Sequence, residues 1–173
     1  MRLQQAKRAT DFADAANVRV LIVGSGLTGS LTCFHLRQKF KSARIDVADM
    51  ARGAGGRMST TRYGANAIKA NTGAQYLSCF SSEAANLLQT VCSVDRVDSP
   101  LRRSTHFLLQ PDEAYSHFLP RGGTNMAVKD FLSAGSPNTC SFESRLQCIT
   151  KLNEKKGFLK VPFYGCECAF LRL

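Results

Sequence analysis

The sequence predicts an α/β fold with a parallel sheet, and three neighbouring segments carry that prediction. Residues 18–23 (VRVLIV) form a short apolar run rich in β-branched side chains, as in a buried strand. Leu27, Leu31 and Phe34 then lie at helical spacing, and the last turn of this helix is basic. Residues 43–50 (ARIDVADM) alternate as a second strand. A strand, a helix and a strand in this order predict a βαβ unit with parallel strands.

The middle of the chain has a weaker pattern. Residues 52–66 are rich in glycine and arginine, which is typical either of an ordered functional loop or of a mobile connector. Residues 82–92 have a helical pattern. Short alternating segments follow at 105–109 (THFLL) and 113–119 (EAYSHFL), and we expect each to form a strand.

A third helix is predicted after the break at 120–124 (PRGGT). Val128, Phe131 and Leu132 lie on one face of it, and Gly135 is placed as its C-terminal cap.

The C-terminal part reads as a hairpin. Residues 139–152 and 157–163 form its two arms, and the polar turn NEKK joins them.

Composition narrows the class of protein. The net charge is +10, but the basic residues are scattered in short pairs, so we expect no nucleic-acid partner. No apolar run reaches the roughly 20 residues of a membrane-spanning helix, so we expect no membrane partner. The N-terminal segment has no secretory signal and only a weak likeness to an organelle presequence, which favours a cytoplasmic location. Neither the seven Cys nor the three His have metal-ligand spacing, so no metal site is expected.

The first helix is preceded by a GxGxxG motif, formed by Gly24, Gly26 and Gly29. The first glycine permits a tight turn, the second lets the backbone approach a pyrophosphate, and the third lets the helix pack against the strand. Asp49 ends the next strand about 20 residues further on, where an acid accepts hydrogen bonds from a ribose hydroxyl. The motif therefore predicts a Rossmann-like dinucleotide site, and its carboxylate favours FAD or NAD over NADP.

A second motif, GGRM, follows the acidic strand end. Gly55 and Gly56 would let this loop pass close to the ligand. Arg57 offers a guanidinium that pairs bidentately with a phosphate.

With these motifs the chain resembles the flavoprotein amine-oxidase superfamily, and within it the renalases. The resemblance covers about residues 18–162 and rests on VLIVGSGLTGSL, Asp49, GGRMSTTR, NTGAQYLSC and PRGGTNMAVKDFL. It implies a two-domain Rossmann-like fold with non-covalently bound FAD. It also implies that residues 18–76 and 119–162 form the cofactor domain and that 77–118 form part of a smaller substrate domain. The composition of residues 1–17 predicts a disordered lead-in, and residues 163–173 form a tail that is atypical of the family.

The resemblance also implies site residues. Thr28 and Arg57 would hold the pyrophosphate, Gln75 and Tyr76 would lie near the flavin ring, and Leu146 would offer backbone groups to the adenine. The expected cofactor-binding residues are Gly24, Gly26, Leu27, Thr28, Gly29, Asp49, Gly56, Arg57, Met58, Gln75, Tyr76 and Leu146. No acid–base pair or nucleophile is evident, so catalytic residues are not assigned.

The activity implied by the resemblance is that of an FAD-dependent oxidase. Its small-molecule substrates would be dihydro isomers of NAD(P)H, with hydride transfer to flavin and O2 reduced to H2O2. Two departures stand out: Asn71 replaces the Asp that renalases carry before GAQY, and residues 163–173 have no counterpart in them. Two other interpretations stay open, a NAD-binding Rossmann dehydrogenase and an inactive truncated isoform that acts as a binding fragment.

Overall fold

The computed structural model describes residues 18–64, 68–97, 116–147, 150–153, 158–163 and 166–172, with no side-chain detail beyond 147. Strand β1 (Arg19–Val23), helix α1 (Leu27–Lys39) and strand β2 (Arg44–Ala48) follow each other as the sequence predicts. The two strands pair in parallel, with Val20 opposite Ile45 and Ile22 opposite Val47. The predicted βαβ unit is therefore confirmed.

A third parallel strand extends this sheet from a distant part of the chain. Strand β8 (Thr139–Ser141) pairs in parallel with β2, and the sheet order is β1-β2-β8. The expectation of one long hairpin arm at 139–152 was wrong, because this segment is divided between β8 and β9 (Thr150–Asn153). The division reflects long-range pairing: β8 bonds to β2, whereas β9 bonds to β10 (Phe158–Phe163).

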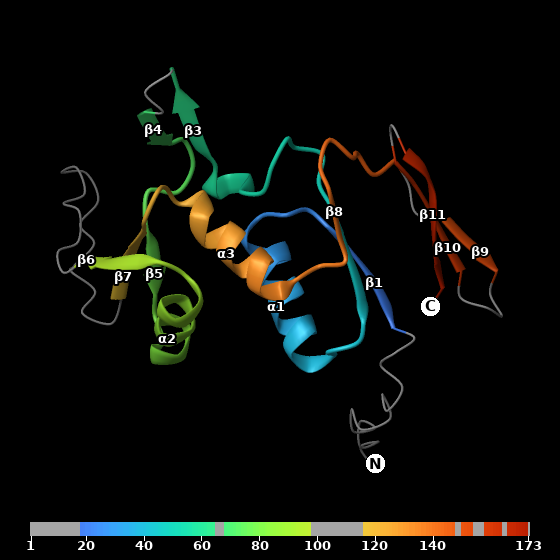
Figure 1. Ribbon diagram of the computed structural model, residues 1–173, viewed down its shortest axis with the longest axis horizontal. Coiled ribbons are helices and arrows are strands. Elements are labelled where there is room, and N and C mark those ends of the chain that lie inside the picture. The colour runs from blue at the N-terminus through green and yellow to red at the C-terminus, as the bar shows by residue number, and fades with distance from the viewer. Residues whose placement is uncertain are drawn as a thin grey trace, which may run out of the picture.

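Helices α1 and α3 (Asn125–Gly135) lie side by side on one face of the parallel sheet (Figure 1). Val128, Phe131 and Leu132 of α3 are buried, as predicted. The rings of Phe34 and Phe131 meet edge to face with centroids 5.8 Å apart. Apolar side chains of these helices and of β2 form the centre of one core.

Small residues bring the two helices close together. A Cβ added to Gly135 would lie 2.8 Å from both the Cys33 Sγ and the Phe34 amide nitrogen. The prediction that Gly135 is the cap of α3 was wrong: it is the last helical residue, and Ser136 takes the left-handed position with φ +43°. Gly135 is needed at this helix contact instead.

The glycine-rich stretch after β2 is ordered. A single turn of 3-10 helix, η2 (Gly56–Met58), leads into the hairpin of β3 (Thr60–Tyr63) and β4 (Ile68–Asn71). Sequence analysis gave no strand here, because most side chains of this hairpin are polar and exposed.

A separate antiparallel sheet has the order β5-β7-β6. It is formed by β5 (Leu77–Cys79), β6 (Val94–Val97) and β7 (Ser116–Pro120), with helix α2 (Ser82–Val91) between β5 and β6 in the chain. Helix α2 confirms the expected helix at 82–92, and β7 confirms part of 113–119. The strand expected at 105–109 lies outside the described residues.

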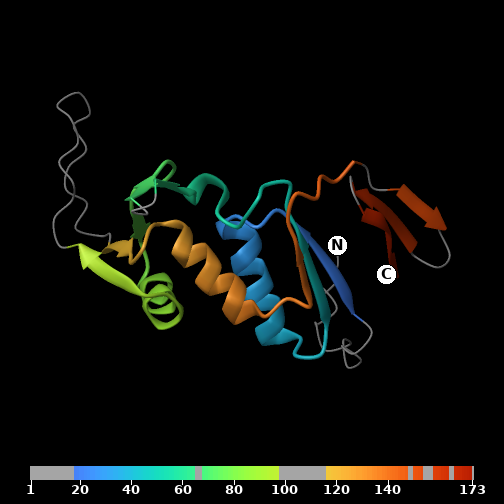
Figure 2. The same ribbon diagram turned by 45° about the horizontal axis from the view of Figure 1, so that its top comes forward.

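A third sheet, of order β11-β10-β9, lies on the opposite side of the parallel sheet from the helices (Figures 1 and 2). Strands β9 and β10 are antiparallel, which confirms the C-terminal hairpin. Strand β11 (Cys166–Arg172) pairs antiparallel with β10. Residues 166–172 of the tail that had no counterpart in renalases therefore form a strand of this sheet.

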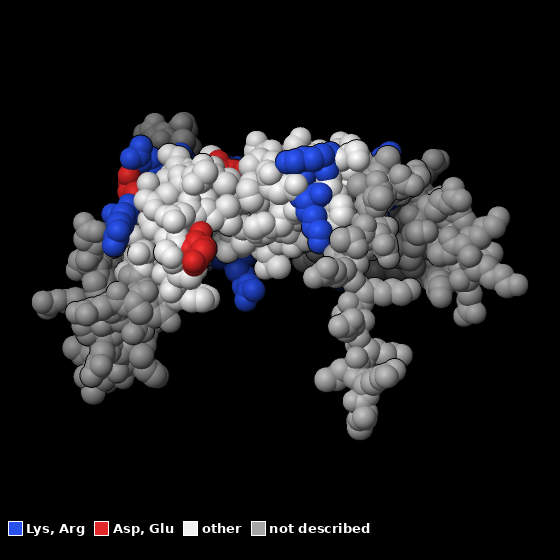
Figure 3. All heavy atoms as spheres, turned by 90° about the horizontal axis from the view of Figure 1, so that it is seen from below, with Lys and Arg blue, Asp and Glu red and all other residues white. Residues whose placement is uncertain are grey.

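The distribution of charge over the surface and the hydropathy of the helices can be described for the folded chain. On the face that Figure 3 shows, Lys and Arg side chains occur in separate groups and not in one continuous patch. Within the part of the chain that the structure describes, no helix is long and apolar enough to cross a membrane.

Candidate dinucleotide-binding site

The glycine loop between β1 and α1 needs its glycines for two different reasons. Gly24 has φ +97°, a left-handed conformation that L side chains rarely adopt, and its N–H donates to the Ala48 carbonyl at 2.7 Å. A Cβ on Gly29 would overlap the Gly24 carbonyl oxygen, so this glycine lets the first turn of α1 pack on the loop. A Cβ on Gly26 would meet nothing closer than the Gly56 Cα at 3.9 Å.

Helix α1 begins at this loop with its first N–H groups available. Gly26 is the N-cap residue and provides no side-chain cap, and no acidic residue lies in the first turn. The first N–H groups of a helix have no intrahelical acceptor, and the helix dipole adds positive potential there. Thr28 is exposed in this turn, whereas Leu27 is half-buried and packs against the core. This end of α1 is suited to bind an anion such as a pyrophosphate.

The GGRM turn lies directly against the glycine loop. Gly26 and Gly55 form an isolated parallel bridge, and the Gly55 N–H donates to the Ser25 carbonyl at 3.2 Å. A Cβ on Gly56, whose φ is +53°, would lie 3.3 Å from the Gly26 Cα. Two glycine motifs that are 30 residues apart in the sequence are thus in direct backbone contact.

Asp49 lies at the carboxyl end of β2 and is held by Ser25. The Ser25 N–H and Oγ each lie 2.6 Å from the Asp49 Oδ2, and the Ala51 N–H donates to Oδ1 at 2.8 Å. Burial acts to raise the carboxyl pKa of Asp49, but hydrogen bonds from the Ser25 hydroxyl and from the Ala51 and Ser25 amides lower it below its ordinary value. A charged acceptor therefore stands beside the glycine loop.

The contact of Ser25 with Asp49 was not foreseen in the sequence analysis. Ser25 occupies a variable position of GxGxxG, and the motif gives no signal for its side chain. The sequence does show a hydroxyl residue inside the motif and an acid at the end of the next strand. It does not show that the two are in contact.

Arg57 and Met58 differ in what they present to a ligand. Arg57 is exposed, and its guanidinium makes no hydrogen bond to the described residues. The Arg57 carbonyl accepts from the Ala74 N–H at 2.9 Å. Met58 has its side chain in the core, so only its backbone faces the turn.

Residues 71–76 run alongside the GGRM turn. A Cβ on Gly73 would overlap the Arg57 carbonyl oxygen, so this glycine permits the close approach of the two segments. The Gln75 side-chain amide donates to the Asn71 carbonyl at 2.7 Å and to the Gly73 carbonyl at 3.2 Å. Tyr76 is half-buried at the end of this segment.

The side chain of Asn71 has a structural role that the sequence analysis did not foresee. Its Oδ1 accepts from the Thr60 hydroxyl at 2.9 Å and from the Thr124 N–H at 3.0 Å. Thr124 precedes α3, so Asn71 links the β3–β4 hairpin to the N-terminus of that helix.

A hydroxyl–imidazole pair lies next to Tyr76 on the β5-β7-β6 sheet. The Ser78 Oγ is 2.8 Å from the His117 Nδ1, and the Tyr76 and His117 rings meet edge to face at 5.5 Å. Sequence analysis found no acid–base pair, because Ser78 and His117 are 39 residues apart and come together only through strand pairing.

Leu146 is placed by the segment that follows β8. The chain after β8 returns to the end of β2: the Glu143 N–H donates to the Ala51 carbonyl at 3.0 Å, and the Ser144 N–H to the Asp49 carbonyl at 2.9 Å. Leu146 follows two residues later and is half-buried. The structure thus joins the glycine loop, the GGRM turn and Asp49, connects residues 71–76 through Arg57, and approaches Leu146 only through its neighbours in the chain.

Residues 22–91 match the family described as the NAD(P)-binding Rossmann-like domain. The parallel sheet β1-β2-β8 with its βαβ unit is the α/β, Rossmann-like fold class that the sequence predicts.

Solved structures share this fold at low sequence identity. A protein from Exiguobacterium sp. 255-15 assigned as a protoporphyrinogen oxidase superposes with a TM-score of 0.65 at 9% identity, covering 88% of this chain and 57% of that one. Tetracycline destructase Tet(51) gives 0.51 at 13% identity, with 90% and 37% covered. Diels-Alderase PyrE3 gives 0.52 at 12% identity, with 88% and 30% covered. The chain thus spans less than two thirds of each. No curated protein matches it by sequence.

Proposed function

We propose that this chain forms the cofactor-binding part of an FAD-dependent oxidoreductase of the renalase type. The observation that carries the proposal is the contact between the two glycine motifs, in which Gly55 pairs with Gly26 and donates to Ser25. A NAD-dependent dehydrogenase has use for GxGxxG and Asp49, but not for a GGRM turn packed on the loop. The fold shared with a protein assigned as an oxidase supports the same class.

The residues present fit a dinucleotide. A Cβ on Gly24 would meet nothing within 4 Å and one on Gly26 only the Gly56 Cα at 3.9 Å, and α1 starts beside these glycines without a side-chain cap, as a pyrophosphate site requires. Asp49 offers a charged acceptor to a ribose hydroxyl, and Arg57 offers to a phosphate a guanidinium that bonds to none of the described residues.

The remaining assignments rest on the resemblance to renalases. Gln75 and Tyr76 would lie near the flavin ring, and Leu146 would contact the adenine through its backbone. When bound, FAD supplies hydride acceptance, with O2 as the terminal electron acceptor and H2O2 as product. The substrates we propose are dihydro isomers of NAD(P)H. The protein's own part is to bind and orient both molecules.

A NAD-binding dehydrogenase is the second candidate, and the match to a NAD(P)-binding domain favours it. The two are separated by titrating the purified chain with FAD and with NAD⁺ and by recording flavin absorbance after gel filtration. Retention of FAD in preference to NAD⁺ supports the flavoprotein. Binding of NAD⁺ alone would replace it with the dehydrogenase.

The substitution Gly26→Ala tests whether this loop is the site. Its Cβ has room within the protein, so we expect normal folding, but the methyl group would occupy the space that a pyrophosphate needs. FAD affinity should fall at least tenfold. Gly53→Ala is the matched control, because a Cβ there meets nothing within 4 Å and the residue lies outside both glycine motifs. Equal FAD affinity in both variants would place the site elsewhere.

A further inference from the structure

Ser25 directs both of its hydrogen-bond donors at one atom. Its N–H and its Oγ each lie 2.6 Å from the Asp49 Oδ2. The residue is fully buried, and its carbonyl accepts from the Gly55 N–H. A hydroxyl that donates to a carboxylate at this distance makes a charge-assisted hydrogen bond, which is stronger than a neutral one.

These contacts leave little of the carboxylate unused. A carboxylate has about four acceptor positions, two on each oxygen. Ser25 takes both positions on Oδ2, and the Ala51 N–H takes one on Oδ1. As far as the described residues are concerned, one position on Oδ1 stays open to a ligand.

We propose that Ser25 is a positioning residue of the dinucleotide site, which turns Asp49 so that Oδ1 alone accepts one hydroxyl of the ligand's ribose. The inference rests on the proposed function, because it assigns Asp49 to a bound dinucleotide. Without the Ser25 hydroxyl, the Ser25 N–H would hold Oδ2 alone, and the carboxylate would be freer to rotate away from the ligand.

The Ser25 contact also favours the charged form of Asp49. Its hydroxyl makes the largest of the hydrogen-bond contributions that lower the Asp49 pKa against the effect of burial. From β8, Cys140 is the titratable group coupled to Asp49, and burial followed by the Asp49 charge raises the pKa of its thiol, so it stays neutral in acid. Among the described residues, no Lys, Arg or His forms an ion pair with Asp49.

Ser30 provides a matched control within the same segment. It is also a fully buried serine, but its hydroxyl donates to the Leu27 carbonyl at 2.9 Å within α1. Ser30→Ala therefore removes a buried hydroxyl five residues away without touching Asp49.

The test is calorimetric titration of the full chain with FAD between pH 4 and pH 8. For Ser25→Ala we expect about tenfold weaker binding at pH 7, because the ribose hydroxyl loses most of its hydrogen bond to a charged Asp49 carboxylate that is no longer fixed. We also expect binding to be lost at a higher pH than in the wild type, because the Asp49 pKa rises. Ser30→Ala should keep the wild-type affinity and pH profile. Ser25→Gly is measured alongside. It also removes the hydroxyl, and it leaves no side chain that has to pack in the buried site.

A second measurement needs no ligand. A ¹³C NMR titration of the aspartate carboxyl groups should show a higher Asp49 pKa in the Ser25 variants and no change in Ser30→Ala. If the wild type binds FAD and the Ser25 variants keep its affinity and its pH profile, the inference is overturned while the proposed function stands. If the wild type binds no FAD at any pH, the proposed function fails and the inference fails with it.

Discussion

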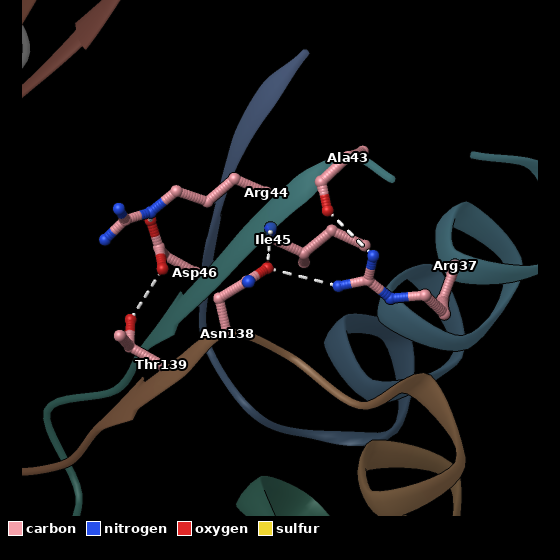
Figure 4. Close-up of polar contacts among 7 residues, drawn as sticks. All are labelled: Arg37, Ala43, Arg44, Ile45, Asp46, Asn138 and Thr139. Atoms are coloured by element: carbon pink, nitrogen blue, oxygen red, sulfur yellow. Dashed lines mark hydrogen bonds and ion pairs between the residues drawn. The ribbon is translucent and has the colours of Figure 1, made fainter. Parts of the chain in front are cut away.

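The Nη2 of Arg37 donates a hydrogen bond to the Oδ1 of Asn138 across 101 residues of sequence, at 3.1 Å. The same Oδ1 accepts from the Ile45 N–H at 2.8 Å, so Asn138 is bound to α1 and to β2 at once (Figure 4). Arg37 also donates to the carbonyls of Ala43, at 2.7 Å, and Ser136, at 3.1 Å. One guanidinium thus joins the end of α1, the start of β2 and the end of α3.

Arg37→Ala should destabilise the fold by about 2 kcal/mol, since hydrogen bonds to a charged group are worth roughly 1.5–3 kcal/mol and these are only partly buried. Urea unfolding measures the change. Lys41→Ala is the control. Of the described residues, the Lys41 side chain bonds to Gln38 alone, and Arg37 uses the Lys41 carbonyl, which the variant keeps. If both variants unfold at the same urea concentration, Arg37 does not join these elements.

Gly135→Ala should destabilise the chain by about 1–3 kcal/mol, the range for a side chain forced into a packed contact. The added Cβ would lie 2.8 Å from both the Cys33 Sγ and the Phe34 nitrogen. The second of these atoms belongs to the backbone, so Cys33→Ala should restore only part of the loss in the double variant. If Cys33→Ala restored all of the lost stability, the backbone of α1 would have to move away from the added Cβ at little cost. Thermal unfolding of the two single variants and the double variant decides.

Local pattern was enough to predict the βαβ unit, because each of its elements repeats at the period of its own secondary structure. The apolar alternation of β2 and the spacing of Leu31 and Phe34 needed no partner to be recognised. The hairpin of Thr60–Tyr63 and Ile68–Asn71 had no such pattern, since its mostly polar, exposed residues are determined by pairing with each other. Strand β8 was merged with β9 for the same reason: three exposed residues become a strand only through β2.

The candidate site was likewise predicted where local sequence restricts the residue type and missed where long-range contacts decide. The glycines and Asp49 were predicted because backbone conformation and phosphate chemistry restrict the residue type at those positions. Ser25 was not, because its role depends on the distance to Asp49, which spacing along the sequence does not encode. The pair of Ser78 and His117 likewise required the register of β5 and β7.

Ser136→Gly should stabilise the chain by about 1 kcal/mol, the typical cost of the left-handed conformation for an L side chain. Ser136 has φ +43° at the end of α3, and its N–H caps the carbonyls of Leu132 and Ser133. Glycine would keep that capping bond and remove the steric cost. A rise in the melting temperature checks this. A fall would mean that the added flexibility of the unfolded chain outweighs the relief.

Cys92 should be the slowest of the described cysteines to react with iodoacetamide at pH 8. Burial, and then the charge of Asp130, raise the pKa of its thiol to about 12. The reactive thiolate is then roughly a thousandfold rarer than for an ordinary cysteine. Peptide mapping by mass spectrometry measures each site, and urea-unfolded protein gives the reference rates. Rapid labelling of Cys92 in the native chain would contradict the burial of this thiol.

Asn71→Asp should stabilise the chain at pH 7 by about 0.5 kcal/mol, the usual effect of a negative charge at a helix N-terminus. The carboxylate keeps both acceptor contacts of Asn71, to the Thr60 hydroxyl and the Thr124 N–H, and adds charge beside α3. These contacts lower the folded-state pKa of the new carboxyl group, so the gain is present above its ordinary pKa and is lost as the pH falls through the folded value.

Urea unfolding at pH 7 and near pH 3 tests this dependence, since an unperturbed aspartate titrates near pH 4. Asn71→Ala is the matched variant, and it should lose about 1–2 kcal/mol at both pH values because the Thr124 N–H is left without its acceptor. If the Asn71→Asp variant is less stable than the wild type at pH 7, the acceptor role of this side chain is contradicted. Stabilisation would show that the acid expected at position 71 by resemblance to renalases is compatible with this fold.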